Sequence, residues 1–360
     1  PAVGLHPVPS STRRGHSGTL NPRPPAITTA RTPPQRKTKK MTLRDRLPEL
    51  CVMLIGMAAL FAWNAVITIP TYWRQRFCGS PLARYHESAF SLAYQAAALV
   101  VAAWAPKLSR RISVRRRIVP TTYCLGVIFV LFALLAVWAD APRDSVFAPA
   151  TVIGVALCGG LSQLLCSATY GVCAALRDNF TAANMAGQGL AGVAPALAVV
   201  LVALSSSGTP DEACVAPHID KAAVLYFVAS ALLFGAAVAA FGVLERSTRY
   251  IASGLGDAVS VEEDDDEEAE PDLDTNLLEN DGDIASVCRS IALPALSVFL
   301  VFTCTLSVFP ALTSLTRAPS NANALHKRLF VPLLFLEFNA LDTVGRASAA
   351  CFEAPSSRTL

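Results

Sequence analysis

Long apolar runs recur along this chain and are separated by short charged or proline-rich segments. Because an α-helix rises about 1.5 Å per residue, about twenty apolar residues are enough to cross the hydrocarbon core of a bilayer. The runs, a mean hydropathy of +0.44 and only 16% charged residues predict an all-α polytopic membrane protein with about eight transmembrane helices. The predicted spans are Leu50–Ile69, Ser88–Ala105, Ile118–Ala139, Thr151–Leu176, Ala182–Leu204, Ala222–Leu244, Ile291–Leu315 and Leu329–Ala350.

Basic residues are concentrated between the second and third predicted spans. Residues 106–117 contain one lysine and five arginines but no acidic residue. Because short loops rich in Lys and Arg stay on the cytoplasmic side, the N-terminus and the segment 245–290 are expected to be cytoplasmic as well. Arg74, Arg76 and Arg84 lie in the first outer loop of this topology and oppose it.

Two segments have the composition of unfolded chain. The residues before Met41 are rich in Pro, Ser, Thr and basic residues, and Glu262–Glu268 is an almost unbroken acidic run. Together they predict a six-helix bundle, an acidic cytoplasmic linker and the start of a second bundle with two helices. The predicted boundaries are 1–48 for a disordered tail, 49–250 for the first bundle, 251–287 for the linker, 288–350 for the second bundle and 351–360 for a final tail.

The eighth predicted span contains polar and ionisable residues, which are unusual within a transmembrane helix. Asn339, Asp342 and Arg346 fall within about 60° of one another on a helical wheel, whereas Glu337 points to nearly the opposite side. An ionisable side chain near the bilayer centre costs about 2.5 to 3.5 kcal/mol on insertion scales, so such residues usually face a bundle interior or an aqueous path. The shared face is therefore a candidate site for a polar substrate.

Other spans contribute further candidates. Trp63 and Asn64 lie deep in the first span, where an indole and an amide are both unusual, and Gln163 and Cys166 lie in the fourth. A set of small residues with one amide opens the fifth span and predicts close helix packing or gating. That set is Gly187, Gln188, Gly189 and Gly192.

A proline interrupts the seventh predicted span directly after an aromatic residue. Pro310 follows Phe309, and a proline inside a helix removes a backbone hydrogen bond. We expect a kink or a break here. Broken helices are common where transporters bind their substrates.

Several classes of function lack their sequence signatures. The five histidines lie in predicted tails or loops, and the ten cysteines have no metal-site spacing, although Cys78 and Cys214 share the outer side and a disulfide between them stays open. The chain has no phosphate loop and no paired-carboxylate or nucleophile-elbow pattern. We expect no enzyme, no metal and no cofactor, and the leading class is a carrier.

Four stretches carry a resemblance to a known family. They are Ala62-Trp63-Asn64 with Thr68, Gly187-Gln188-Gly189-Leu190-Ala191-Gly192, Phe299 to Phe309-Pro310-Ala311, and Phe338-Asn339-Ala340-Leu341-Asp342-Thr343-Val344-Gly345-Arg346. With these stretches in this order from about Leu50 to Ala350, the chain resembles the equilibrative nucleoside transporter family of solute carriers. The resemblance implies a major-facilitator-like bundle of eleven spans that carries nucleosides or nucleobases by alternating access.

The resemblance also implies roles for single residues. Trp63 would stack on the nucleobase, while Asp342 and Arg346 would hydrogen-bond the sugar or base with Asn339 in support. Phe309 and Pro310 would line or shape the cavity.

The chain departs from the family pattern in a few places. Cys166 stands where the family commonly has a glutamine, with Gln163 one turn earlier, Thr343 replaces an aromatic residue, and Glu337 replaces a small or neutral one. Glu337 as a proton-coupling acid and Glu337 as a structural partner are both open.

The expected function is facilitated diffusion of nucleosides or nucleobases, with proton coupling open. A truncated, non-transporting or regulatory membrane protein and a carrier for another small polar solute are the alternatives, because the chain ends soon after the eighth span and three further spans are expected. The expected partners are the substrate and the lipid bilayer, without nucleic acid, and nothing in the sequence sets an oligomeric state. The location is a plasma or a vacuolar or lysosomal membrane, and the dileucine-like stretch Asp274–Leu278 favours an internal one.

Overall fold

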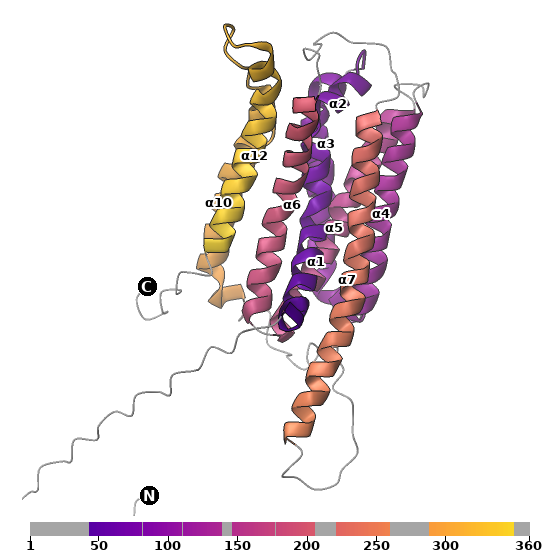
Figure 1. Cartoon of the computed structure of the whole chain (residues 1–360), viewed down its shortest axis with the longest axis vertical. Coiled ribbons are helices and arrows are strands. Elements are labelled where there is room, and N and C mark those ends of the chain that lie inside the picture. The colour runs from indigo at the N-terminus through magenta and orange to yellow at the C-terminus, as the bar shows by residue number, and fades with distance from the viewer. Residues whose placement is uncertain are drawn as a thin grey trace, which may run out of the picture. The chain divides into compact units, whose positions relative to one another are not determined.

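The computed structural model describes residues 43–80, 82–109, 111–138, 146–176, 178–205, 221–259 and 288–348, and every regular element within these ranges is helical. Figure 1 shows the helices. Their bounds are α1 Leu43–Ile67, α2 Pro70–Arg76, α3 Leu82–Ser109, α4 Val114–Val137, α5 Ala148–Leu176, α6 Asp178–Ser205, α7 Lys221–Val259, α10 Ala292–Val308, α11 Ala311–Leu315 and α12 Ala324–Ser348. The predicted all-α membrane architecture is confirmed.

Six of these helices are long and apolar enough to cross a bilayer: α1, α3, α4, α5, α6 and α7. The seventh expected span differs, because α10 has 17 residues and a crossing takes about twenty. The eighth differs for another reason. α12 has 25 residues but carries Glu337, Asp342 and Arg346 in its C-terminal half. Of the eight spans expected from sequence, the described helices therefore include six that qualify on length and apolarity.

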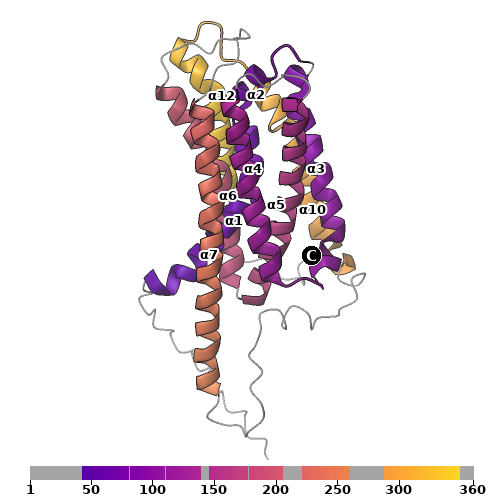
Figure 2. The same ribbon diagram turned by 90° about the vertical axis from the view of Figure 1, so that its right-hand side faces the viewer.

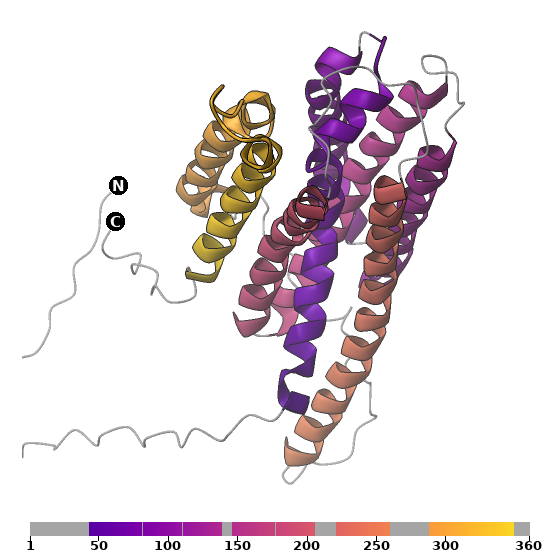
Figure 3. The ribbon, with the colours of Figure 1, turned by 45° about the horizontal axis from the view of Figure 1, so that its top comes forward.

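The helix contacts place α6 at the centre of the region that concerns function. α6 packs along α1 on one side and along α12 on another, and α1 also contacts α7. Figures 1 and 3 both show α6 between α1 and α12. Other close pairs include α3 with α5 and α4 with α7, which Figure 2 shows in the view turned by 90°, and α5 also contacts α4 and α1.

An aromatic core closes one end of this helix group. Trp73 on α2 is buried and donates from Nε1 to the Val66 carbonyl over 2.8 Å, which ties the short helix to the end of α1. Its ring lies edge-on to Phe90 of α3 and Phe132 of α4. Tyr226 of α7 donates to the Ala65 carbonyl at 2.9 Å. These contacts fix α1 relative to its neighbours.

Large apolar side chains on the outer faces remain exposed, as lipid-facing residues must be. They include Leu92, Leu99 and Trp104 on α3 and Leu225 and Leu232 on α7. In lipid such faces have no hydrophobic drive to pack against other helices. Close packing of small residues and polar contacts must then hold the helices together.

Two helices and one histidine differ from what the apolar runs indicated. α1 begins at Leu43, before the predicted span that starts at Leu50, and α7 continues to Val259, beyond the predicted span that ends at Leu244. The histidines are not all in loops, since His86 is buried within α3. In each case the helix extends past the apolar run from which its limits were inferred.

The expected interruption of the seventh span is confirmed, because the helix breaks at Phe309–Pro310, where α10 ends and α11 begins. Cys78 is disulfide-bonded. Cys214, the partner that the sequence left open, lies outside the described residues.

Arg76 has a structural use at its end of the molecule. It donates from Nη2 to the carbonyls of Leu135 and Trp138 at 3.0 and 3.1 Å, and its guanidinium lies 4.5 Å from the centre of the Phe147 ring. It therefore caps the C-terminus of α4. A basic residue in this loop has a role in folding, which explains why it departs from the charge pattern that predicts orientation.

Candidate functional site

The polar face of α12 is turned towards α6. Asn339 is 5% exposed and donates from Nδ2 to the Phe335 carbonyl at 2.8 Å, one turn earlier on its own helix. Thr343 in turn donates to the Asn339 carbonyl at 2.7 Å. Glu337 is exposed. The predicted separation of Glu337 from the other polar residues is confirmed.

Two glycines allow α12 to approach α6 closely. A Cβ atom on Gly189 would lie 2.8 Å from the Thr343 hydroxyl, and one on Gly192 would collide with the Asn339 amide oxygen. The third glycine of the set faces elsewhere, because a Cβ on Gly187 would run into the backbone at Met53 of α1. The small residues thus serve two helix interfaces.

Arg346 and Asp342 form an ion pair on the C-terminal half of α12. The Arg346 Nε donates to the Asp342 Oδ2 at 2.8 Å, and the two side chains are 14% and 37% exposed. They are one helical turn apart, at the spacing that lets two side chains on a helix meet. Pairing lowers the cost of placing both charges in an apolar helix and leaves the pair without net charge.

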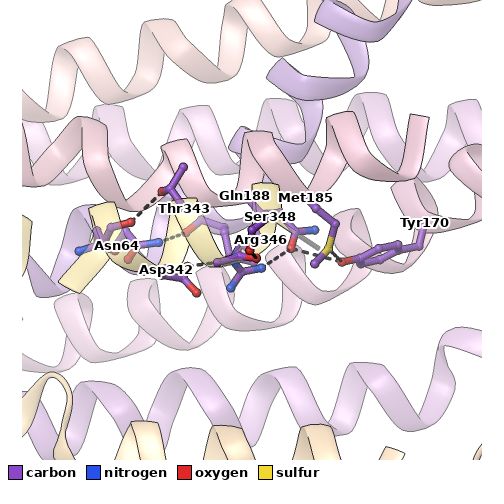
Figure 4. A network of polar contacts seen from close by, with 11 residues as sticks. Asn64, Tyr170, Met185, Gln188, Asp342, Thr343, Arg346 and Ser348 are labelled. Atoms are coloured by element: carbon purple, nitrogen blue, oxygen red, sulfur yellow. Dashed lines mark hydrogen bonds and ion pairs between the residues drawn. The ribbon is translucent and has the colours of Figure 1, made fainter. Parts of the chain in front are cut away.

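The arginine also reaches across to the neighbouring helix. Its Nη1 donates to the Gln188 Oε1 of α6 at 3.2 Å, and Figure 4 shows the guanidinium between the aspartate and this amide. Gln188 is 4% exposed and is bound from a third helix as well, since the Tyr170 hydroxyl of α5 lies 3.3 Å from the same oxygen. Three helices thus meet at one amide.

Cys166 completes the surroundings of this amide. The Gln188 Nε2 lies 3.9 Å from the Cys166 Sγ, and the Tyr170 hydroxyl also lies 3.0 Å from the Met185 Sδ. Cys166 was a candidate from the sequence, whereas Tyr170 and Met185 were missed. The spacing contained a signal for Tyr170, because it follows Cys166 by four residues and so shares its face of α5.

The α1 candidates lie in the core beside this group. Trp63 is 9% exposed and its ring centre lies 4.8 Å from that of Tyr94 on α3. Asn64 is buried and donates to the Leu60 carbonyl of its own helix at 3.1 Å; Figure 4 draws it with the polar network. Within the described residues, neither side chain has a hydrogen bond to α12.

The broken helix packs against the start of the same α12 stretch. The ring of Phe309 is stacked on Phe338 with centres 3.9 Å apart and also contacts Phe335 at 4.9 Å. Pro310 is buried beside it. The two residues hold the α10–α11 break next to Asn339, which follows Phe338 directly.

Gln163, like Trp63 and Asn64, has no hydrogen bond to Arg346, Asp342 or Gln188 within the described part of the chain. It is half-buried on α5, and among the described residues its side chain makes no hydrogen bond. Gln188, expected to serve packing or gating, is the amide that meets Arg346. No group of metal-ligating side chains occurs in the described part of the chain.

The arrangement can hold a solute that offers both hydrogen-bond donors and acceptors, and sequence comparisons show which family the chain belongs to. The model of the family described as nucleoside transporter matches residues 150–360, which include α5, α6 and α12. The chain belongs to the nucleoside transporter family.

Relatives across the family share about a quarter of their residues with this chain. It is 24% identical over 347 residues to equilibrative nucleoside transporter 1 of Mus musculus, covering 84% of this chain and 73% of the relative. It is 26% identical over 341 residues to equilibrative nucleoside transporter 2 of Homo sapiens, covering 83% and 73%. The family assignment that the four sequence stretches indicated is confirmed.

Proposed function

We propose that this chain carries nucleosides across a membrane by facilitated diffusion and holds them at the Asp342–Arg346 pair. Family membership supports nucleosides as the substrate. The observation that carries the position is the ion pair itself, 2.8 Å long, on a face of α12 that contacts α6. Alternating access through movement of the two helix bundles about a central site is the general mechanism of such carriers.

The pair suits the sugar of a nucleoside. An ionised carboxylate accepts hydrogen bonds through two oxygens, and only Oδ2 of Asp342 is used by Arg346. A guanidinium has five N–H donors, and the contacts to Asp342 and Gln188 use two of them. Hydroxyl groups of ribose donate and accept, so they can bond to both residues.

Residues from other helices supply the rest of the proposed site. Trp63 would stack on the base, with Asn64 beside it, and stacking of a base on an aromatic ring contributes about 1 to 3 kcal/mol. Phe309 and Pro310 would shape the side formed by the helix break. Gln163 and Cys166 on α5 are proposed to face the substrate.

Uptake of labelled adenosine and uridine tests this proposal. The protein is expressed from its complete reading frame in transport-deficient cells, and Asp342→Ala and Arg346→Ala are compared at equal surface amounts. We expect both variants to lose uptake. A wild-type protein that reaches the membrane but moves neither nucleosides nor nucleobases would contradict the proposal.

The proposed topology follows from the charges. We place residues 106–117 and both chain ends of the six-helix bundle at the cytoplasmic face. Residues 251–287, which begin with the end of α7, are proposed to be a cytoplasmic segment, and residues 288–350 the start of a second bundle. Arg115 at the start of α4 and Glu245 in the C-terminal half of α7 form an ion pair 3.1 Å long. This supports placing both segments on the same side of the membrane. Labelling of single cysteines at Ser109 and Ser320 by an impermeant reagent tests it, with only Ser320 expected to react from outside.

A further inference from the structure

Among the described residues, the amide of Gln188 is the one hydrogen-bond partner of Arg346 outside its own helix. We propose that Gln188 is a positioning residue that sets the orientation of the Arg346 guanidinium towards the substrate, together with the Tyr170 hydroxyl behind it. The inference deepens the proposed function and rests on it. The sequence predicted packing or gating for Gln188 and gave it no part in orienting Arg346.

The donors around Gln188 fix which way its amide points. Arg346 Nη1 at 3.2 Å is always a donor, and the Tyr170 hydroxyl at 3.3 Å can donate to the same atom. The guanidinium can only donate and so requires an oxygen, which means that Oε1 faces Arg346 and the NH₂ group faces Cys166 at 3.9 Å. The reverse orientation would set the NH₂ group against the guanidinium.

The Tyr170 hydroxyl has a choice between two acceptors. It lies 3.0 Å from the Met185 sulfur and 3.3 Å from the Gln188 oxygen, but it carries a single proton. A thioether is a weak acceptor compared with an amide oxygen. Tyr170 therefore favours Oε1 and holds the amide from the side opposite Arg346.

Burial protects the two hydrogen bonds of Gln188 from competition by water. Gln188 is 4% exposed, so water cannot easily replace either contact. It lies between Gly187, which faces α1, and Gly189, which faces α12. The α6 backbone at Gln188 is therefore packed against α1 on one side and α12 on the other, which fixes the position from which the amide side chain extends.

The consequence concerns the free part of the guanidinium. With Nε bound to Asp342 and Nη1 bound to Gln188, the plane of the guanidinium is fixed by two contacts from two helices. The second terminal nitrogen, Nη2, has no hydrogen bond within the described part of the chain, and its two N–H groups then point in fixed directions. A guanidinium held only by Asp342 would rotate about its side-chain bonds and would bind with a larger loss of entropy.

Gln188→Met tests the role, because methionine keeps the length and apolar volume of the side chain and removes the acceptor. Uptake kinetics of labelled uridine are measured for the protein from its complete reading frame, with surface amounts determined by biotinylation. We expect the KM to rise about tenfold, as for a lost hydrogen bond to a charged group, and the maximal rate to stay within about twofold. Gln95→Met on α3 is the matched control, since its side chain makes no hydrogen bond among the described residues, and its KM should not change.

Two further measurements separate positioning from packing. In an Arg346→Lys background, Gln188→Met should raise the KM by less than about twofold, since the group it positions has gone. Tyr170→Phe should raise the KM by about two- to threefold through the loss of a neutral hydrogen bond. If Gln188→Met does not reach the membrane, the KM of Tyr170→Phe tests the positioning role in its place.

The outcomes are distinct. An unchanged KM in Gln188→Met, or an equal rise in the wild-type and Arg346→Lys backgrounds, overturns the positioning role. If Gln188→Met is absent from the surface, an unchanged KM in Tyr170→Phe overturns it as well. Absence of uptake by the wild-type protein contradicts the proposed function instead. The affinities of the variants for uridine are then compared by the shift in melting temperature that uridine causes in each purified protein.

Discussion

The Arg346 guanidinium donates to the Gln188 amide oxygen over 3.2 Å and joins α12 to α6. This contact exists because Gly189 and Gly192 let the two backbones come close. The interface of small residues between α6 and α12 therefore also contains the polar site. Substitutions that shift α12 relative to α6 are expected to change the distance between Arg346 and Gln188.

Asp342→Asn leaves Arg346 charged and without its ionised partner. The lost charge-assisted hydrogen bond corresponds to about 1.5 to 3 kcal/mol, which we discount towards its lower end because Asp342 is 37% exposed. We expect the melting temperature of the purified protein to fall and the KM for uridine to rise about tenfold. Differential scanning fluorimetry and uptake kinetics measure the two effects.

Glu337→Gln provides the comparison on the same helix. Glu337 is exposed and lies on the face away from Asn339, so neither stability nor the KM should change. A large effect of Glu337→Gln on uptake, particularly on its pH dependence, would favour the proton-coupling alternative for this residue.

Alanine at the α6 glycines should separate the two helix interfaces. At Gly187 the new Cβ meets the backbone of α1 at Met53 and lies 2.9 Å from the Met57 nitrogen, so α1 must move and folded protein should be scarce. At Gly189 it lies 2.8 Å from the Thr343 hydroxyl and 2.9 Å from the Thr343 Cα of α12, so α12 must shift, but by less than α1 must shift for Gly187→Ala. We expect this variant to fold with a raised KM, measured by uptake after normalisation to surface protein.

Gly171→Ala on α5 is the matched control. A Cβ at Gly171 meets nothing within 4 Å, and alanine is favoured over glycine in a helix by about 1 kcal/mol. The control should express as well as the wild type. If Gly187→Ala behaves like Gly171→Ala, the close approach of α1 and α6 is not required for folding.

The sequence predicted the helices well because apolar length is a strong local signal. It also predicted the break at Pro310, which follows from the missing backbone N–H. It missed α2, because a helix of seven residues that include two arginines and a glutamine has no membrane-span signature. It placed helix ends too early or too late where polar residues continue a helix beyond the membrane, as at the end of α7.

The site was predictable along one helix and much less so between helices. Helical spacing alone placed Asn339, Asp342 and Arg346 on one face and Glu337 on the other. Which partner each would meet depends on the rotation and crossing of α6 and α5, and no local pattern encodes this. Gln188 therefore looked like one member of a glycine-rich packing motif until its amide was seen against Arg346.

Arg76→Met tests whether this arginine is needed for folding. It removes the bonds to the Leu135 and Trp138 carbonyls and the contact with Phe147, which we expect to lower stability by about 1 to 2 kcal/mol. The melting temperature should fall while the KM for uridine stays the same. Arg74→Met removes an exposed charge from the same short helix and should leave the melting temperature nearly unchanged.

Trp63 offers the sharpest distinction between packing and substrate binding. Its ring is buried against Tyr94, so Trp63→Leu should lower the melting temperature in either case. If the indole also stacks on the base, the KM should rise about tenfold in Trp63→Leu and less in Trp63→Phe, which keeps an aromatic face. Phe61→Leu, two residues away in the core, should lower the melting temperature alone. A Trp63→Leu variant with the KM of Phe61→Leu would restrict the tryptophan to packing.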